Sequence, residues 1–220
     1  MKKIIYILLT LSFLILPFYT TKGNAQENED AILTPNEYCA KGDKILAHYE
    51  KLEDKTDASK YLNAAKYYYY QAARLDVSNQ NSMVGVARVA LYKGNTRDAK
   101  NALMVALNVN ENNPKVNYYL GETFFTEGEY FQAIDFYTHA YSNGFSQDYN
   151  TNLKLGICYE KLDDTNKAKF HYNNALKIKP NSQEVKERLK YMNTSENEYR
   201  DEENEVIDAK DLEKLNIPNL

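Results

Sequence analysis

Residues 114–147 read PKVNYYLGETFFTEGEYFQAIDFYTHAYSNGFSQ, and this stretch decides the fold class. It holds two sets of apolar and small residues: Leu120, Gly121 and Phe124, followed by Ala133, Tyr137 and Ala140. Their spacing places each set on one face of a helix. Gly128, between two acids, marks the turn, and small residues at Gly121 and Ala133 are expected to let the two helix backbones approach closely. Two short helices cannot bury such faces alone, so the stretch predicts a hairpin that packs against copies of itself.

The same pattern recurs along the chain at intervals of 34 or 35 residues. One interval forward, the matching residues are Leu155, Gly156, Tyr159, Ala168, Tyr172 and Ala175. One interval back, they are Val86, Ala87, Ala90, Ala99, Leu103 and Ala106. Two intervals back, only the second helix matches, through Ala65, Tyr69 and Ala72. Self-similarity at a fixed period of this length predicts an array of stacked repeats.

A period of 34 residues that carries Leu-Gly-x-x-aromatic and then Ala-x-x-x-aromatic resembles the tetratricopeptide repeat family. The resemblance covers about residues 38–192. It implies an all-α fold, a right-handed α-solenoid of antiparallel helix hairpins with a C-terminal capping helix. One departure is plain: the family has a bulky aromatic residue three positions before the leucine, and this chain has Asn117 or Asn152 there.

The repeat pattern divides the chain into units of about 36–79, 80–113, 114–148 and 149–182, with a capping helix at 183–194. The first unit is atypical because its two helices are separated by too long a spacing for a regular repeat. Its first helix is expected to begin after Asn36 as N-cap and to run to about residue 54. Asn143 and Gly144 are expected to end a helix and to accommodate the one extra residue of the third unit.

The first 25 residues are typical of a targeting segment. Lys2 and Lys3 form a charged start, residues 4–18 form an apolar core, and Gly23-Asn24-Ala25 resembles a cleavage site. An uncleaved membrane anchor is the competing interpretation, but fifteen apolar residues fall short of the roughly 20 needed to span a bilayer. We expect cleavage, a flexible leader at 26–35 and no stable membrane span afterwards. The expected location is the periplasm or cell envelope of a bacterium, with secretion also open.

The chain carries 27 basic and 31 acidic side chains, for a formal net charge of −4. Removal of the lysines of the targeting segment makes the remaining chain still more acidic. Such a protein is a poor candidate for binding nucleic acid. The segment 195–220 is the most acidic part, and two interpretations of it stay open. It is either a solvated tail or an interaction segment that uses its apolar residues: Val206, Ile207, Leu212, Leu215 and Ile217.

Nothing in the sequence indicates catalysis or a cofactor. The three histidines, His48, His139 and His171, lie in different units and share no metal-ligand spacing. No glycine-rich phosphate loop and no nucleophile-elbow or zinc-helix motif is present. We therefore predict a protein that is not an enzyme, with no cofactor and no metal site.

The two cysteines fall in helices three repeats apart. Helices packed about 8–10 Å apart would then separate them by roughly 25–30 Å, far beyond the reach of a disulfide. We predict no bridge between them, with Cys158 as a buried filler. Cys39, near the start of the array, is the better candidate for a reactive or intermolecular thiol.

The resemblance also implies a concave groove lined by the first helix of each unit. Matching spacing assigns the groove to positions two, five, nine and twelve of each unit. Position two is polar in all three units, with Asn81, Lys115 and Asn150. The proposed partner-binding residues at the other positions are Val84, Arg88, Leu91, Tyr118, Glu122, Phe125, Leu153 and Ile157, and Glu160 holds position twelve of the fourth unit. Arg88 is the one obvious partner for an anion. We predict a non-enzymatic scaffold that holds a peptide or protein in this groove, in an oligomeric state that the sequence does not reveal. The alternative is a solute or glycan binder that uses the groove tyrosines.

Overall fold

The computed structural model describes residues 33–56 and 58–204, and side chains as far as residue 194. The targeting segment, nearly all of the leader and the end of the acidic tail lie outside the described residues, so the predictions for them stay predictions. Every regular element in the described ranges is helical. None of the helices there is both long and apolar enough to cross a membrane.

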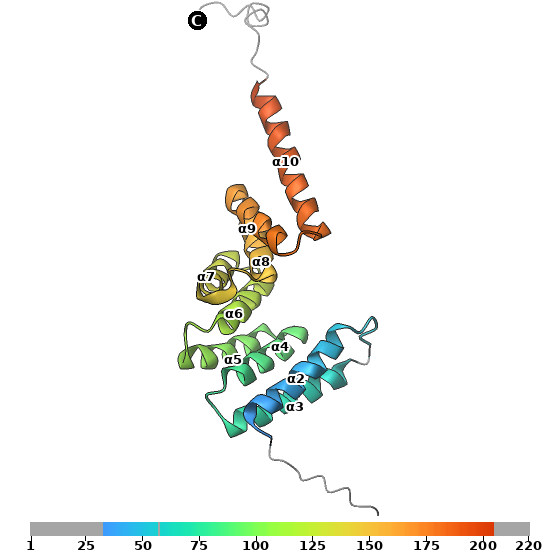
Figure 1. Ribbon diagram of the computed structural model, residues 1–220, viewed down its shortest axis with the longest axis vertical. Helices are drawn as coiled ribbons and strands as arrows, with labels where there is room; N and C mark the ends of the chain where they lie inside the picture. Colours follow the sequence, from blue (N-terminus) through green and yellow to red (C-terminus); the bar gives the residue numbers. More distant parts are fainter. Residues whose placement is uncertain (1–32, 57, 205–220) are drawn as a thin grey trace, which may run out of the picture. The chain divides into compact units, whose positions relative to one another are not determined.

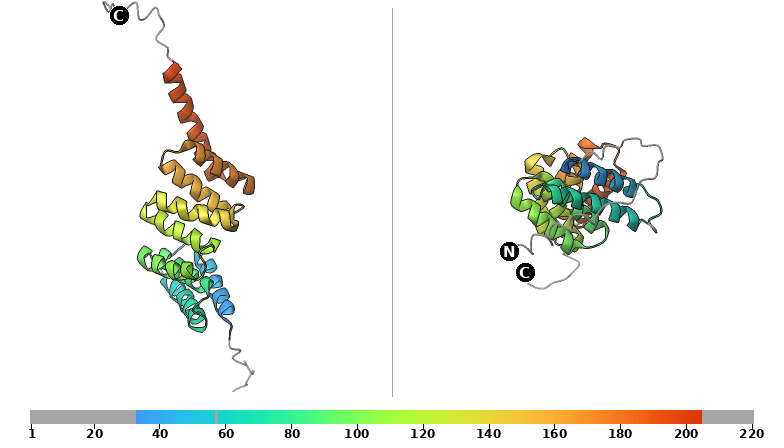
Figure 2. Two further views of the ribbon diagram at one scale, coloured as in Figure 1. Left: turned by 90° about the vertical axis from the view of Figure 1, so that its left-hand side faces the viewer. Right: turned by 90° about the horizontal axis from the view of Figure 1, so that it is seen from below.

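The helices form four antiparallel hairpins. The elements in order are α2 (Pro35–Glu50), α3 (Ser59–Leu75), α4 (Gln80–Tyr92), α5 (Thr96–Val109), α6 (Pro114–Glu127), α7 (Tyr130–Ala140), α8 (Tyr149–Lys161), α9 (Thr165–Ile178) and α10 (Gln183–Asn204). Each second helix packs on the first helix of the next hairpin, and α4 also contacts α2 and α6 (Figures 1 and 2). The predicted all-α array of stacked hairpins is therefore confirmed.

Polar side chains at helix starts fix the hairpin boundaries. Asn79, Asn95, Asn113, Asp148 and Asp164 each accept a hydrogen bond from a backbone N–H of the helix that follows. The first helix differs from the prediction, because Thr34 rather than Asn36 is its N-cap. Thr34 and Glu37 form a reciprocal capping box with Pro35 at the first helical position.

The glycines of the first helices make room for tyrosine rings. A Cβ added to Gly121 would lie 2.6 Å from the ring of Tyr137, and one added to Gly156 would lie 2.5 Å from the ring of Tyr172. Gly42 and Gly85 face Tyr69 from two successive hairpins, at 2.7 and 2.2 Å. The expectation that Gly121 serves close approach of two backbones is thus corrected, since a ring from the second helix fills the space.

The two asparagines that replace the family's aromatic residue are buried. Asn117 donates from Nδ2 to the carbonyls of Glu111 and Asn113, at 2.6 and 3.0 Å. Asn152 donates in the same way to Ser146 and Asp148, at 3.0 and 2.9 Å. Each one fastens the start of its helix to the preceding loop, so hydrogen bonding takes the place of an aromatic contact.

Two regions extend the simple pattern. The extra residue of the third unit lies in a wide turn after α7, η1 (Tyr141–Phe145), in which Asn143 and Gly144 have non-helical backbone angles and Gly144 has a φ of 125°, so the prediction that these two residues end a helix is confirmed. The last helix, α10, runs to Asn204 instead of ending near residue 194. The sequence from 183 to 204 contains neither glycine nor proline and is rich in Glu, Lys and Arg, which favour helix.

The structure does not support a reactive Cys39. Its side chain is 4% exposed, and its Sγ lies 3.7 Å from Oδ1 of Asn79. Burial and the nearby Asp43 carboxylate raise the pKa of the thiol to about 11, so little thiolate is present at neutral pH. Cys158 is fully buried, as expected, and neither cysteine forms a disulfide.

His171 is half-buried in a box of aromatic rings. It stacks on Tyr159, with centroids 5.6 Å apart, and meets Tyr141 and Phe170 edge-on. Its Nδ1 lies 3.4 Å from Oδ1 of Asn152. Burial lowers the pKa of the imidazole to about 4, so the folded protein holds this histidine neutral.

We predict that Gly121→Ala destabilises the protein. The added methyl group clashes with the fully buried ring of Tyr137, and overpacking of this kind costs about 1–3 kcal/mol, offset in part by the better helix propensity of alanine. Urea unfolding monitored by circular dichroism measures the change. Thr126→Ala, at an exposed position of the same helix, serves as the control. Equal stability of the Gly121→Ala and wild-type proteins would contradict the ring-insertion model.

We also predict a pH-dependent contribution from His171. The folded pKa lies below the ordinary 6.5, so the stabilisation is complete above pH 6.5 and is lost as the pH falls from 6.5 towards 4. His171→Phe should fold, because Phe136 occupies the matching position one repeat earlier. Its melting temperature should fall less than that of the wild type over this pH range. The exposed His139→Asn should keep the wild-type slope, and identical slopes for all three proteins would refute the prediction.

Candidate functional site

A cavity of about 190 Å³ lies where the first helices of the second, third and fourth hairpins face the interior of the array. Helix α4 contributes Asn81, Val84, Gly85 and Arg88; α6 contributes Lys115, Tyr118 and Tyr119; α8 contributes Asn150; Asp43 of α2 and the loop residues Phe145 and Asp148 complete the lining. Residues from α4, α6 and α8 meet here because α4 contacts α6, and η1 contacts both α6 and α8. The cavity therefore lies where the resemblance implied a groove.

Three polar side chains sit at the rim of the cavity. Asn81, Lys115 and Asn150 are exposed and occupy the same position near the start of α4, α6 and α8. Amide and ammonium groups in this arrangement offer hydrogen-bond donors from three successive repeats, and the two amides also offer acceptors. A ligand that lies along the array can contact all three.

Aromatic rings form the wall of the cavity on α6. Tyr118 meets Tyr119 edge-on with centroids 5.1 Å apart, and Phe145 lies 6.2 Å from Tyr118 in a tilted arrangement. Burial, together with the Glu122 carboxylate, raises the pKa of the Tyr118 phenol far above its ordinary value. Tyr118 thus stays a neutral hydrogen-bonding group, and the wall is apolar with polar tips.

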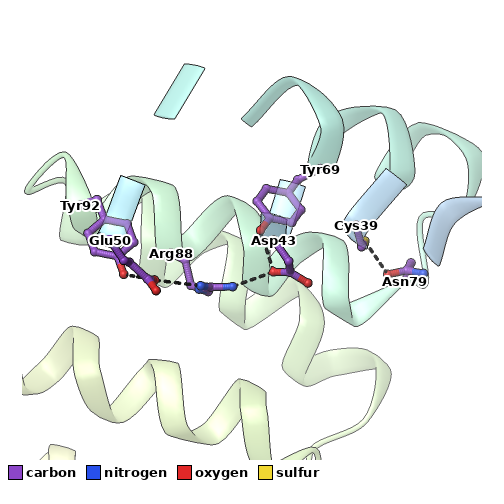
Figure 3. A network of polar contacts seen from close by, with 7 residues as sticks. All are labelled: Cys39, Asp43, Glu50, Tyr69, Asn79, Arg88 and Tyr92. Atoms are coloured by element: carbon purple, nitrogen blue, oxygen red, sulfur yellow. Dashed lines mark hydrogen bonds and ion pairs between the residues drawn. The ribbon is translucent and has the colours of Figure 1, made fainter. Parts of the chain in front are cut away.

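Arg88 is held by a network of polar contacts and is not a free cation. Its guanidinium donates to Asp43 at 2.7 Å and to Glu50 at 3.1 Å. Asp43 also accepts from the hydroxyl of Tyr69 at 2.8 Å, and Glu50 accepts from the hydroxyl of Tyr92 (Figure 3). The expectation of an anion-binding arginine is therefore corrected, because two carboxylates already surround the one guanidinium.

The Arg88 network is the first of three similar contacts along the array. In the third hairpin, Tyr137 donates to Glu122 at 2.6 Å, and Lys154 of the next hairpin lies 3.2 Å from the same carboxylate group. In the fourth, Tyr172 donates to Glu160, which pairs with Arg188 of α10 at 3.0 Å. In each contact, a carboxylate accepts a hydrogen bond from a tyrosine of the same hairpin. The carboxylate also pairs with a cation from the helix that begins the next unit, which is α4, α8 or α10.

The structure divides the residues predicted from the sequence into two groups. Val84, Arg88 and Tyr118 line the cavity together with the predicted polar residues Asn81, Lys115 and Asn150, although Val84 is only 5% exposed. The others lie outside it. Glu122 is engaged by Tyr137, Leu91 packs in the α4–α7 core, and Leu153 and Ile157 are buried against α9 and α10. Phe125 packs between Tyr130 and the ammonium of Lys154, 5.8 and 4.2 Å from its ring centre.

Sequence reasoning missed several lining residues. Asp43 reaches the cavity from the atypical first unit, which a repeat alignment cannot place in register. Phe145 ends η1 and Asp148 is the N-cap of α8, and the path of the chain to both depends on the left-handed Gly144. Tyr119 could have been found, since it follows Tyr118 directly. Among the described residues, no group of three or more His, Cys, Asp or Glu side chains is arranged to hold a metal ion.

A protein-family model for the tetratricopeptide repeat matches residues 149–182, the fourth hairpin. Among curated proteins, this chain is similar to the CTR9 homolog of Arabidopsis thaliana, with 24% identity over 135 residues. The match covers 61% of this chain and only 12% of that protein. The chain therefore corresponds to a small part of this relative.

Solved structures share the arrangement of the hairpins. PilF from Pseudomonas aeruginosa matches with a TM-score of 0.65 and 17% identity, over 75% of this chain and 70% of that one. YrrB, described as a tetratricopeptide repeat protein with an unusual peptide-binding site, matches with a TM-score of 0.53 and 17% identity, over 71% and 74% of the two chains. MamA matches at 0.52 with 22% identity, over 60% and 77%. At these identities, the likeness is one of fold.

Proposed function

We propose, from the premise that the chain is a tetratricopeptide repeat protein, that it is a scaffold whose concave groove binds an extended segment of a partner protein. The cavity that spans α4, α6 and α8 carries this proposal. It combines an aromatic wall with donors and acceptors from three successive repeats, and such a surface suits a peptide with one apolar anchor.

The dimensions of the cavity favour a peptide side chain over a whole small ligand. A volume of about 190 Å³ is below the 300–1,000 Å³ that is usual for small-molecule sites. One apolar or aromatic side chain fits against Tyr118 and Phe145. The peptide backbone on either side then lies within reach of Asn81 and Asn150, which can hydrogen-bond its amide groups.

The alternative, a solute or glycan binder, has less support in this groove. Sugar stacking needs an open aromatic face, and Tyr118 and Tyr119 are half-buried and meet each other edge-on. The exposed tyrosines Tyr67 and Tyr70 lie on α3, away from the cavity. A scaffold without catalytic activity also agrees with the engagement of Arg88, Glu122 and Glu160 in contacts between hairpins.

We predict that Asn81→Ala with Asn150→Ala abolishes partner capture. Both side chains are exposed, so the fold and the helical circular dichroism signal should be unchanged. The measurement is site-specific photocrosslinking in envelope extract, with the crosslinker at Lys115 in the wild-type and double-variant backgrounds. A discrete partner should be crosslinked only in the wild-type background.

The matched control places the crosslinker at Asn173, an exposed position of α9 outside the cavity. It should yield no discrete product. If the double variant retains the Lys115 product, or if Asn173 gives the same product, the partner does not bind in the concave groove.

We further propose that the protein acts in the bacterial periplasm or cell envelope. The support is the charged and apolar pattern of residues 1–25, with its small-residue site before Gln26. Expressed in a bacterium with its targeting segment, the chain should be recovered from the periplasmic fraction with Gln26 as its first residue. Mass spectrometry of the intact protein tests this, and a product that retains residues 1–25 would contradict cleavage. Ala25→Leu, which spoils the small-residue site, should give the longer product.

A further inference from the structure

A second groove lies on the other side of α4. The α4 residues that line the concave cavity are Asn81, Val84, Gly85 and Arg88. Those that line the second groove are Met83, Val86, Val89 and Ala90, with Lys93 at the C-cap of the helix. Members of each set recur at spacings of three and four, and the two sets are displaced around the helix, so they occupy different faces. Helices α3 and α5 form the two walls of the second groove, and its volume is about 600 Å³.

The groove exists because two positions in the second hairpin are small, and one of them is Ala90 of α4, which matches Phe124 and Tyr159 in the later hairpins. Ala102 of α5, Phe136 of α7 and His171 of α9 are equivalent, each lying one residue before the residue that packs at the hairpin centre. Phe136 stacks on Phe124, with ring centres 5.3 Å apart, and His171 stacks on Tyr159. These rings fill the spaces beside the first helices of their own hairpins. Alanine at both 90 and 102 leaves the equivalent space beside α4 open.

The lining of the groove is apolar with a basic rim. Val86, Val89 and Ala90 form the floor, and Tyr70 and Val105 stand on the two walls with exposures of 51% and 49%. A partner that covered Tyr70 and Val105 would remove the most apolar surface from water, and burial of that surface would stabilise the complex.

The charges at the rim favour an acidic occupant. Lys93 donates to the amide oxygen of Asn63 at 2.7 Å, and the ammonium of Lys66 lies 5.3 Å from the ring centre of Tyr70. Neither lysine has an ion pair with any carboxylate of the described residues. The one acid of the lining, Asp98, already accepts from the Asn95 side chain at 2.7 Å. The basic rim is therefore available to carboxylates from outside.

We propose that the groove between α3 and α5 binds an acidic amphipathic helix of a partner protein, at a surface separate from the concave cavity. One or two apolar side chains of that helix lie over Ala102 and against Tyr70 and Val105. Its carboxylates meet Lys66 and Lys93. A trough with two helical walls and an apolar floor is the form of surface that receives an amphipathic helix.

The test uses a defined probe and the full chain. A fluorescein-labelled synthetic helix of about four turns carries Leu on one face and Glu on the other, and a matched peptide carries Lys in place of Glu. Fluorescence anisotropy should show saturable binding of the acidic probe only. Ala102→Phe, which places in the groove the ring that Phe136 provides one repeat later, should weaken binding at least about tenfold. Lys66→Glu with Lys93→Glu should do the same, and thermal melts should show that both variants are folded.

Two controls separate this proposal from its rivals. The concave-groove variant Asn81→Ala with Asn150→Ala should bind the probe as the wild type does. The experiment therefore distinguishes a wrong proposal for the second groove from a wrong proposal for the concave cavity. A chain without residues 205–220 should also bind like the wild type. Binding that appears only in that shortened chain would assign the groove to the protein's own acidic segment and overturn the proposal. Equal binding of both peptides, or binding unchanged by Ala102→Phe, would overturn it as well.

Discussion

The insertion of a tyrosine ring against a glycine is the contact on which the array depends. Tyr69, Tyr137 and Tyr172 are fully buried, and each ring occupies space that any Cβ on the facing glycine would fill. The hydroxyl of each tyrosine emerges on the inner side of the hairpin and donates to a carboxylate there. One side chain thus packs the hairpin and positions the acid that pairs with the next hairpin's cation.

This coupling explains why the inner face of the array is less free than its composition suggests. Asp43, Glu122 and Glu160 hold neighbouring hairpins together through Arg88, Lys154 and Arg188. Glu122 and Glu160 form partly buried pairs that are expensive to separate, and Arg88 is only 18% exposed although its partner Asp43 is 57% exposed, so these paired groups are poor partners for an incoming ligand. The groups left for recognition are the aromatic wall at Tyr118 and the exposed amides of Asn81 and Asn150.

The second hairpin departs from this rule and carries both candidate surfaces. Leu103 stands where the other hairpins have a buried tyrosine, and Gly85 packs against Tyr69 of the preceding hairpin instead. Ala102 beside it leaves a space that an aromatic side chain fills in the later repeats. The second hairpin is therefore where both candidate surfaces border α4, with a narrow aromatic cavity on one side and a broad apolar groove on the other.

The sequence by itself determined the repeat period, the four hairpins, the turns and the residues at the centre of each hairpin, because helical spacing and small residues are local signals. It also placed Val84, Arg88 and Tyr118 on the lining of the cavity. Only the tertiary structure decided that Arg88 is paired, that Leu153 and Ile157 are buried, and that Asp43 and Phe145 join the cavity. Those outcomes depend on distances between residues far apart in the chain, which the curvature and stacking of the hairpins set and no local pattern records.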